Sequence, residues 1–514
     1  MTSQATATKI GGIWGFDKVR HGYELEADVV VVGSGPGGAV AADNLAAAGM
    51  RVVLVEAGPQ VRPEDMTVAP PLFLAKYYWE GGTRMVAGST PNPCMQGRAL
   101  GGSTVMNSAI MLKLPTWVRD AWAADDGVGA VVHSAGFERA FERVFARTNT
   151  VPTPMTVLGR RNELVRDALA KAGLNGVPLP RAVKDCDGCA DCITGCHTER
   201  KQSMDRAYIP GIVANGGIVC THSNVDRILV EKGRAVGVTG TVVDLATWQN
   251  VARFTVRAPR VIVAGGPGHT AVLLLKSGIT GGGRVGKTLY VHITGAATAR
   301  MEEIVEPWRG ATQGWGAISD EIHGLKYESL WAAPSLIGVN MGGLGHQFLR
   351  ELDNLKHTTV IACVCKAKVN GNVKIRPDGL PLYWINVPDR ELAPLMRGLK
   401  TAADALLGIG ARWVGTSVWG VPERMRTTAD TEALLAKRVK PHHCHMTFNH
   451  IFGSCKMSAD PKRGPVDLRG AVRGVSGVWV TDSSIFPEAS AVNPQATIMA
   501  LSDVISRGIG DMAA

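Results

Sequence analysis

Short apolar runs separated by glycine-rich turns dominate the first part of the chain. Val29 to Val32 is a continuous β-branched run, which is the pattern of a strand buried on both faces of a parallel sheet. The alanine-rich segment 39–48 predicts a helix that Gly49 ends, and residues 51–55 predict a second buried strand. Together these segments predict a complete strand–helix–strand unit.

Two later stretches extend this pattern. VIVAGGPGHTAVLLLKSGI, from Val261, again predicts a strand, a glycine turn and an apolar helix, as expected for a later strand of the same sheet. Between Lys366 and Asp389, extended runs alternate with the turn signals NGN and PDG, a pattern typical of antiparallel hairpins. A helix-like stretch follows over residues 390–407. The sequence thus predicts a parallel sheet interrupted by insertions, and a separate sheet-bearing lobe in the middle third.

Composition narrows the class of protein. The chain has 514 residues, of which 45% are hydrophobic, so we expect a soluble globular protein of two or three domains. Aromatic residues make up only 6% and glycines number 61, which favours tight turns over aromatic platforms for nucleic acid. The net charge of +10 contains no run of five like charges, which indicates a solvated basic surface. We expect no nucleic-acid partner.

The location of the protein is predicted from two further features. The amino terminus lacks the charged-then-apolar pattern of an export signal. No apolar run reaches the roughly 18 residues that a membrane-spanning helix needs. We therefore expect a cytoplasmic protein without a transmembrane segment.

A glycine motif lies between the first predicted strand and helix. Gly33, Gly35 and Gly38 have the G-x-G-x-x-G spacing, and Glu56 ends the next strand. The first glycine allows the turn, the second lets a pyrophosphate approach the backbone, and the third lets the helix pack on the strand. Glu56 is expected to accept hydrogen bonds from the adenosine ribose. This context predicts a dinucleotide site.

Four of the ten cysteines fall within eleven residues, CDGCADCITGC. Cys186, Cys189, Cys192 and Cys196 have the spacing of a bacterial ferredoxin run, with His197 in place of the usual proline. The spacing favours a [4Fe-4S] cluster, or a [3Fe-4S] cluster from which Cys196 stands aside. Tetrahedral zinc also accepts four thiolates and remains an alternative, whereas a reducing cytoplasm disfavours disulfides.

Several segments resemble the glucose-methanol-choline (GMC) oxidoreductases, which are FAD-dependent enzymes of alcohol chemistry. They are GRALGGSTVMNSAIM from Gly97, GIVCTHSNVDRILVEKGRAVGV from Gly217, VIVAGGPGHTAVLLLKSGI from Val261, VGKTLYVH from Val285, and NHIFGSCKM and VTDSSIFPEASAVNPQATIMAL near the end. These matches follow the family order from residue 28 to about residue 505, whereas the middle lobe matches only in general layout.

The resemblance implies an α/β fold with a Rossmann-like FAD-binding domain and an inserted substrate-binding domain built on an antiparallel sheet. The expected boundaries are 1–120, 204–299 and 441–514 for the FAD-binding domain, 121–203 for an insertion with the cysteine-rich loop, and 300–440 for the substrate-binding domain.

The resemblance also implies a set of FAD contacts. The cofactor is expected to lie along Gly101, Gly102, Ser103 and Asn107, near Gly265, with its adenine at the backbone of Val225, its pyrophosphate or ribityl chain at Asp482 and its flavin ring at Asn493 and Pro494. Small residues suit these positions because they let the backbone approach a planar ring. Some members attach FAD covalently to a histidine at the position of Met106, so a non-covalent flavin is expected here.

The expected chemistry centres on His450. Hydride transfer from an alcohol to flavin N5 requires a base beside the hydroxyl group, and a neutral imidazole suits this role. In the family that base is the histidine of H-x-x-G-[ST]-C, which falls on His450 of HIFGSC, and Asn493 is expected to hold the substrate oxygen. The resemblance thus implies oxidation of a small-molecule alcohol, with electrons passing through the cysteine run to a cytochrome, quinone or ferredoxin.

Alternatives remain open. The protein could be an alcohol or sterol oxidase that reduces dioxygen and uses the cysteines structurally, or a hydroxynitrile-type lyase on the same fold, because fold does not fix function. A hydrophobic alcohol is mildly preferred over a sugar. The middle lobe carries Trp308, Trp315, Trp331 and Trp384, although such residues more often belong to a core than to a substrate wall.

Overall fold

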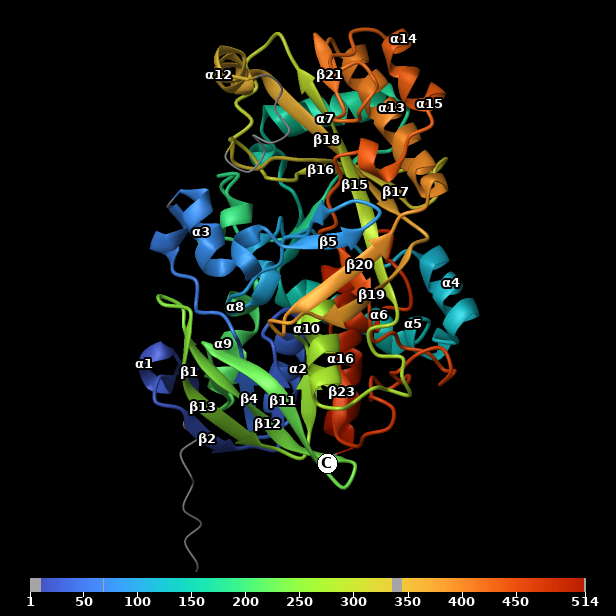
Figure 1. Ribbon diagram of the computed structural model, residues 1–514. Helices are drawn as coiled ribbons and strands as arrows, with labels where there is room; N and C mark the ends of the chain where they lie inside the picture. The colour runs from blue at the N-terminus through green and yellow to red at the C-terminus, as the bar shows by residue number, and fades with distance from the viewer. Residues whose placement is uncertain (1–10, 68, 335–343, 513–514) are drawn as a thin grey trace, which may run out of the picture.

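The computed structural model describes residues 11–67, 69–334 and 344–512. A six-stranded parallel sheet lies in the lower half of the molecule (Figure 1). Its strands, in spatial order, are β1 (Gly12–Trp14), β10 (Ile218–Cys220), β4 (Val52–Val55), β3 (Val29–Val32), β14 (Val261–Val263) and β23 (Val478–Val480). Because these strands come from distant parts of the sequence, the sheet brings separate loops together at its carboxyl edge.

The predicted strand–helix–strand unit is confirmed. Helix α2 (Pro36–Ala47) begins three residues before the predicted start, because Pro36 at the first helical position has a backbone angle already suited to a helix. The strand and helix predicted from Val261 are also confirmed, as β14 and α10 (Gly266–Lys276). The C-terminal helix α16 (Gln495–Asp511) packs along α2.

A four-stranded sheet lies beside the parallel sheet. It contains β11 (Ser223–Glu231), β12 (Arg234–Asp244), β13 (Gln249–Arg257) and β2 (Tyr23–Glu26). The pairing of β11 with β12 shifts register between Val225 and Arg227. Such a bulge redirects the local backbone. Here it lies beside Val225, which lines the large cavity described below.

A seven-stranded antiparallel sheet occupies the upper half (Figure 1). Its main path runs β21 (Trp413–Gly415), β15 (Leu289–Arg300), β18 (Thr358–Lys366), β17 (Leu325–Ser329), β16 (Trp315–Ile318) and β8 (Val177–Pro178), and β22 (Ile451–Gly453) pairs with β15. Helices α7 (Arg160–Lys171) and α13 (Ala393–Gly408) pack on this sheet. Strand β15 pairs with β22 at its start and with β18 further along, so it links the upper sheet to the C-terminal segment.

The hairpin predicted in the middle third is present as β19 (Asn370–Ile375) and β20 (Pro381–Asn386), with the PDG segment at its turn. The prediction of a turn at NGN is wrong, because these residues lie within β19. Gly371 serves close strand approach instead, since a Cβ there would come within 2.2 Å of the Trp384 carbonyl oxygen. The hairpin joins β5 (Met85–Gly88) and β6 (Asn92–Pro93) in a separate four-stranded sheet.

The helix predicted over 390–407 corresponds to α13, preceded by a 3₁₀ turn over Asp389–Leu392. The other described helices, and the two strands of a small separate sheet, are α1 (Phe16–Val19), α3 (Pro70–Tyr77), α4 (Thr116–Asp126), α5 (Gly129–Val132), α6 (Ala135–Arg147), α8 (Met204–Ala207), α9 (Ile209–Ala214), α12 (His346–Asp353), α14 (Thr428–Thr431), α15 (Ala433–Ala436), β7 (Thr150–Pro152) and β9 (Pro180–Ala182). Among the described residues, none of the helices has the length and apolar character needed to cross a membrane. The domain boundaries given above stay a prediction.

Candidate active site

A cavity of about 610 Å³ is lined both by the carboxyl-end loops of the parallel sheet and by the upper antiparallel sheet. Twelve residues singled out from the sequence line it: Gly33, Gly35, Glu56, Gly102, Ser103, Asn107, Val225, Gly265, His450, Asp482, Asn493 and Pro494. Gly38 and Gly101 do not line the cavity but support residues that do. The structure therefore brings the predicted cofactor and catalytic positions to one cavity.

The glycine turn before α2 forms a cradle at the cavity. Gly33 has a φ of +96°, which favours glycine, and a Cβ at Gly35 would meet no atom within 4 Å. A Cβ at Gly38 would lie 1.8 Å from the carbonyl oxygen of Gly33, so only glycine lets α2 approach the strand this closely. The open space at Gly35 and the free amides of the helix N-terminus fit a pyrophosphate group.

Glu56 ties two of the predicted cofactor loops together. Its Oε2 accepts hydrogen bonds from the backbone N of Ser34 at 2.9 Å and from Ser34 Oγ at 2.6 Å. Ser34 Oγ in turn accepts a hydrogen bond from the backbone N of Gly101 at 2.9 Å. Burial raises the pKa of Glu56. Sequence reasoning missed Ser34, which sits between two glycines of the motif and joins it to the loop that begins at Gly101.

Asp482 follows β23 and holds the start of α10 beside the cavity. Its Oδ2 accepts hydrogen bonds from the backbone N of Gly266, at 2.8 Å, and from Thr270 Oγ1. Its Oδ1 accepts from the backbone N of Ser484 at 2.8 Å. Burial raises the pKa of Asp482. The carboxylate thus fixes the position of the turn that contains Gly265.

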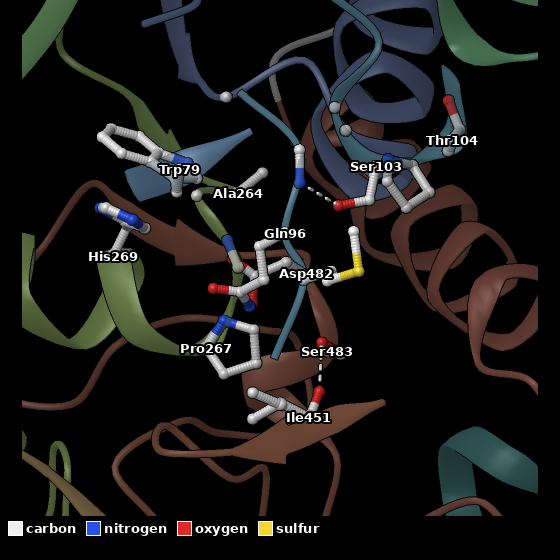
Figure 2. A pocket seen from close by; sticks show the side chains of 18 of the residues that line it. Trp79, Gln96, Ser103, Thr104, Ala264, Pro267, His269, Ile451, Asp482 and Ser483 are labelled. Carbon is white, nitrogen blue, oxygen red and sulfur yellow. Dashed lines mark hydrogen bonds between the residues drawn. The ribbon is translucent and has the colours of Figure 1, made fainter. Parts of the chain in front are cut away.

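Trp79 and His269 form a wall of the cavity that sequence reasoning missed. Figure 2 shows their rings side by side, opposite Ser103 and Thr104, and the ring centroids are 4.1 Å apart. Arg84 Nη1 lies 3.0 Å from His269 Nε2. Burial and Arg84 lower the pKa of His269 well below its ordinary value. Because a guanidinium can only donate, His269 is neutral and accepts at Nε2.

His450 lies directly before β22 and faces His292 of β15. The two Nδ1 atoms are 3.1 Å apart, and the backbone N of His292 donates to the His450 carbonyl oxygen at 3.1 Å. Burial, and then the nearby Lys326 ammonium, lower the pKa of His450 to about 4. His450 is therefore neutral near pH 7. For its Nε2 to carry a free lone pair, His450 must donate from Nδ1 to His292.

Asn493 belongs to a buried polar network that the sequence did not reveal. Its Oδ1 accepts a hydrogen bond from Lys326 Nζ, and the same ammonium forms an ion pair with Glu328. Gln313 Nε2 donates to the other oxygen of Glu328 at 3.1 Å. Glu328 and Gln313 line the cavity with Asn493. Gln313, Lys326 and Glu328 lie on or near β16 and β17, in the lobe where the family resemblance was only one of layout.

This part of the cavity also has an aliphatic patch, with Thr294 and Thr447 beside it. Leu330, Ala362 and Val364 form the patch. The four tryptophans that suggested a hydrophobic substrate lie elsewhere: Trp308, Trp315, Trp331 and Trp384 do not line this cavity. Trp331 is buried in a small cluster apart from the main core, whereas Trp308 and Trp384 are exposed.

Asn107, the last residue of the predicted flavin loop, is held on both sides. Its Nδ2 donates to Gln495 Oε1 at 2.6 Å, and its Oδ1 accepts from the backbone N of Ala109 at 2.9 Å. The preceding Met106 lines the cavity. The amide is thus oriented by contacts within the protein.

The four clustered cysteines surround a second, much smaller space of about 10 Å³. Cys192 is buried, and Cys186, Cys189 and Cys196 are half-buried. A possible metal-binding group within the described residues consists of Cys189, Asp191 and His197. Their ligand atoms all lie within 4.8 Å of one another. The four thiols therefore share one space but do not converge as closely as the ligands of a single tetrahedral zinc ion would.

Buried cations surround this cysteine loop. Arg181 donates from Nη2 to Cys192 Sγ at 3.2 Å and from Nη1 towards Cys186 Sγ at 3.8 Å. Within the described parts of the chain, neither Arg181 nor the buried Lys201 forms a salt bridge with a carboxylate. Burial acts to raise the pKa of Cys192, but Arg181 and Lys201 outweigh it and lower the pKa. The surroundings thus favour negative charge on the Cys192 sulfur, whereas burial raises the pKa of Cys189 to about 12.

The cysteine loop also touches the main cavity. Lys201 Nζ donates to the carbonyl oxygens of Cys192 at 2.8 Å and of Asn107 at 2.9 Å. Ile193 lines the cavity, and Tyr78 OH donates to its carbonyl oxygen at 2.8 Å. A single buried lysine therefore connects the cysteine loop with the predicted flavin loop.

The parallel sheet, the glycine cradle and the adjoining cavity define a dinucleotide-binding oxidoreductase. Family models described as GMC oxidoreductase match residues 74–294 and 368–502, and a model of an FAD binding domain matches residues 28–66. The chain belongs to the GMC oxidoreductase family and binds FAD. The family resemblance and fold class expected from the sequence are confirmed.

Similar proteins support this assignment. The chain is 32% identical over 480 residues to an uncharacterized GMC-type oxidoreductase of Mycobacterium tuberculosis, covering 92% of this chain and 74% of the relative. It is 26% identical over 530 residues to long-chain-alcohol oxidase FAO1 of Arabidopsis thaliana, covering 96% and 68%. The structure of Aspergillus oryzae formate oxidase superposes with a TM-score of 0.72 at 15% identity, covering 95% and 98% of the chains, and shows the shared fold.

Proposed function

We propose that the protein oxidises the CH–OH group of an alcohol to an aldehyde or ketone with non-covalent FAD. His450 acts as the base, and Asn493 binds the substrate oxygen. The observation that carries this proposal is that both side chains line one cavity with the predicted FAD contacts, while the Nδ1 of His450 faces His292. Bound FAD would supply the acceptor for the hydride.

The residues of the chain account for the movement of the proton. With its Nδ1–H donated to His292, His450 presents Nε2 as an acceptor for the alcohol proton. The amide of Asn493 donates to the substrate oxygen, which gains negative charge as the proton leaves. Asn493 is buried and His450 is half-buried, which limits the access of water to both groups.

The substrate we propose is an alcohol with a long aliphatic chain. The patch formed by Leu330, Ala362 and Val364 offers apolar contact to such a chain. The Arabidopsis relative is named a long-chain-alcohol oxidase, which agrees with this choice.

Anaerobic reduction of the bound flavin by a long-chain primary alcohol tests the proposal. Wild-type protein is expected to lose the flavin absorbance, and His450→Ala to lose about 10²- to 10⁴-fold in reduction rate. His442→Ala, at an exposed surface histidine, is the control and should match wild type. An unchanged rate in His450→Ala would contradict the assigned base. Cleavage of a cyanohydrin without flavin reduction would instead support the lyase alternative.

We also propose that Cys186, Cys189, Cys192 and Cys196 bind a [4Fe-4S] or [3Fe-4S] cluster. The ferredoxin-like spacing, the shared space and the buried cations without carboxylate partners support an anionic occupant of this kind. The space of about 10 Å³ matches a single water or ion, so a cluster requires the loop to open around it. Such a cluster would supply a one-electron carrier beside the flavin site, towards a cytochrome, quinone or ferredoxin.

Anaerobic purification followed by quantification of FAD, iron, acid-labile sulfide and zinc tests this assignment. Iron and sulfide in cluster proportion are expected in wild type, and Cys192→Ser should lose them while keeping FAD. Cys94→Ser, at a buried cysteine outside the run, is the matched control. Zinc without sulfide would support the zinc alternative. Flavin without metal, together with dioxygen consumption, would favour an oxidase with structural cysteines.

The cytoplasmic location stays a prediction.

A further inference from the structure

A buried ammonium lies against the substrate-binding amide. Lys326 on β17 is 1% exposed, and its Nζ donates to Asn493 Oδ1. The two residues are 167 positions apart in the sequence. The side chain of Glu328, which is 3% exposed, pairs with the same Nζ. Burial lowers the pKa of Lys326, and Glu328 acts in the opposite direction.

The chemistry of lysine determines which way the amide of Asn493 faces. A protonated lysine has three donors and no acceptor, whereas an amide has an acceptor oxygen and a donor nitrogen. The oxygen of Asn493 must therefore face Lys326, which leaves Nδ2 free for the cavity. Without the lysine, the amide could rotate by half a turn and present its oxygen to the substrate. An oxygen in that position would repel the negative charge that develops on the alcohol oxygen.

We propose that Lys326 is a positioning residue that holds the amide of Asn493 with its NH₂ group towards the substrate oxygen. This inference rests on the proposed function, in which Asn493 binds that oxygen. Lys326 acts through Asn493 and does not line the cavity itself. Glu328 contributes by keeping the buried ammonium paired, since an unpaired buried charge is costly.

A double-mutant cycle tests whether Lys326 acts through Asn493. The variants are Lys326→Met, Asn493→Ala and the double variant, compared by kcat/KM for a long-chain alcohol. Lys326→Met alone is expected to lower kcat/KM about 10- to 100-fold, mainly through kcat, because a transition-state donor is misplaced. In the Asn493→Ala background the same change should have less than about a threefold effect. Equal effects in both backgrounds would overturn the inference.

Acetate binding gives a readout that needs no turnover. Acetate is a probe for an oxygen anion at the Asn493 donor, and its binding is followed by the change in flavin absorbance. The cycle should again be non-additive: Lys326→Met weakens acetate binding at least about threefold with Asn493 present and less without it. An additive cycle overturns the role of Lys326. Failure of alcohols to reduce wild-type flavin overturns the proposed function instead.

A second variant guards against loss of the fold. Lys326→Gln keeps a donor that can reach towards Asn493, so it should recover part of the activity lost in Lys326→Met. FAD content and melting temperature are measured for every variant, so that only folded, flavin-loaded protein enters the cycle. If Lys326→Gln and Lys326→Met are equally impaired at equal FAD content, the donor to Asn493 is not what Lys326 supplies.

Discussion

Gly38→Ala should separate helix α2 from the cofactor cradle. A methyl group at Gly38 would lie 1.8 Å from the carbonyl oxygen of Gly33, and real Cβ contacts essentially never fall below 3.0 Å. The backbone must therefore separate by about 1.2 Å, and backbone cannot rotate away as a side chain can. Overpacking of this kind costs about 3 kcal/mol or more, the upper part of the usual range.

The same displacement should weaken FAD binding. The amides at the start of α2, which would hold the phosphates of FAD, would be displaced, and each lost charge-assisted hydrogen bond costs about 1.5–3 kcal/mol. That loss corresponds to about a 10- to 100-fold increase in the Kd of FAD. Thermal unfolding with and without added FAD, and the FAD content of purified protein, measure both effects. We expect a melting temperature lower by about 3 °C or more and a largely flavin-free protein.

Gly508→Ala is the matched control for this prediction. Gly508 lies in the exposed part of α16, where an added Cβ meets no atom within 4 Å. Replacing an exposed helical glycine should stabilise the protein by about 0.5–1 kcal/mol and leave FAD content unchanged. Wild-type FAD content and melting temperature in Gly38→Ala would refute the argument that close helix packing builds the cradle.

Two further predictions address the same site. Ser34→Ala removes the hydroxyl that links Glu56 with the loop at Gly101, so we expect a loss of about 1–3 kcal/mol in urea unfolding and weaker FAD retention in equilibrium dialysis. His450 has a pKa of about 4 when folded and about 6.5 when unfolded, so the unfolded state binds its proton first as the pH falls. The contribution of His450 to the free energy of unfolding should be constant above about pH 6.5 and fall by about 3 kcal/mol towards pH 4. In His450→Gln, the free energy of urea unfolding should depend less steeply on pH over this range.

The local pattern of the chain was enough to predict the cofactor cradle. The valine run, the three glycines and the second strand each depend on contacts between near neighbours, so periodicity and turn chemistry define β3, α2 and β4. The same holds for the hairpin β19–β20, whose PDG turn was found correctly. The NGN error has a local cause too, because a glycine that allows close strand approach cannot be told from a turn glycine by composition.

The family resemblance supplied candidate residues but not their partners. It pointed to His450, Asn493 and the FAD contacts, and the structure places nine of these positions on one cavity with three more that the glycine motif predicted. It assigned no role to His292, which ends the matched segment VGKTLYVH, and it said nothing of Lys326 or Glu328, which come from the lobe where only the layout matched. These are the residues that determine which ring nitrogen of His450 is free and which side of the Asn493 amide faces the cavity.

The sequence by itself determined the parallel βαβ unit, the family and the cysteine spacing. Each can be recognised from short segments whose residues are close together along the chain. Only the tertiary structure decided the protonation pattern and orientation of the site. His292 meets His450 across 158 positions and Lys326 meets Asn493 across 167, through the antiparallel sheet that carries β15 and β17. The physical reason is that burial and long-range pairing determine where a proton or a hydrogen-bond donor rests, and both arise only once distant strands pack together.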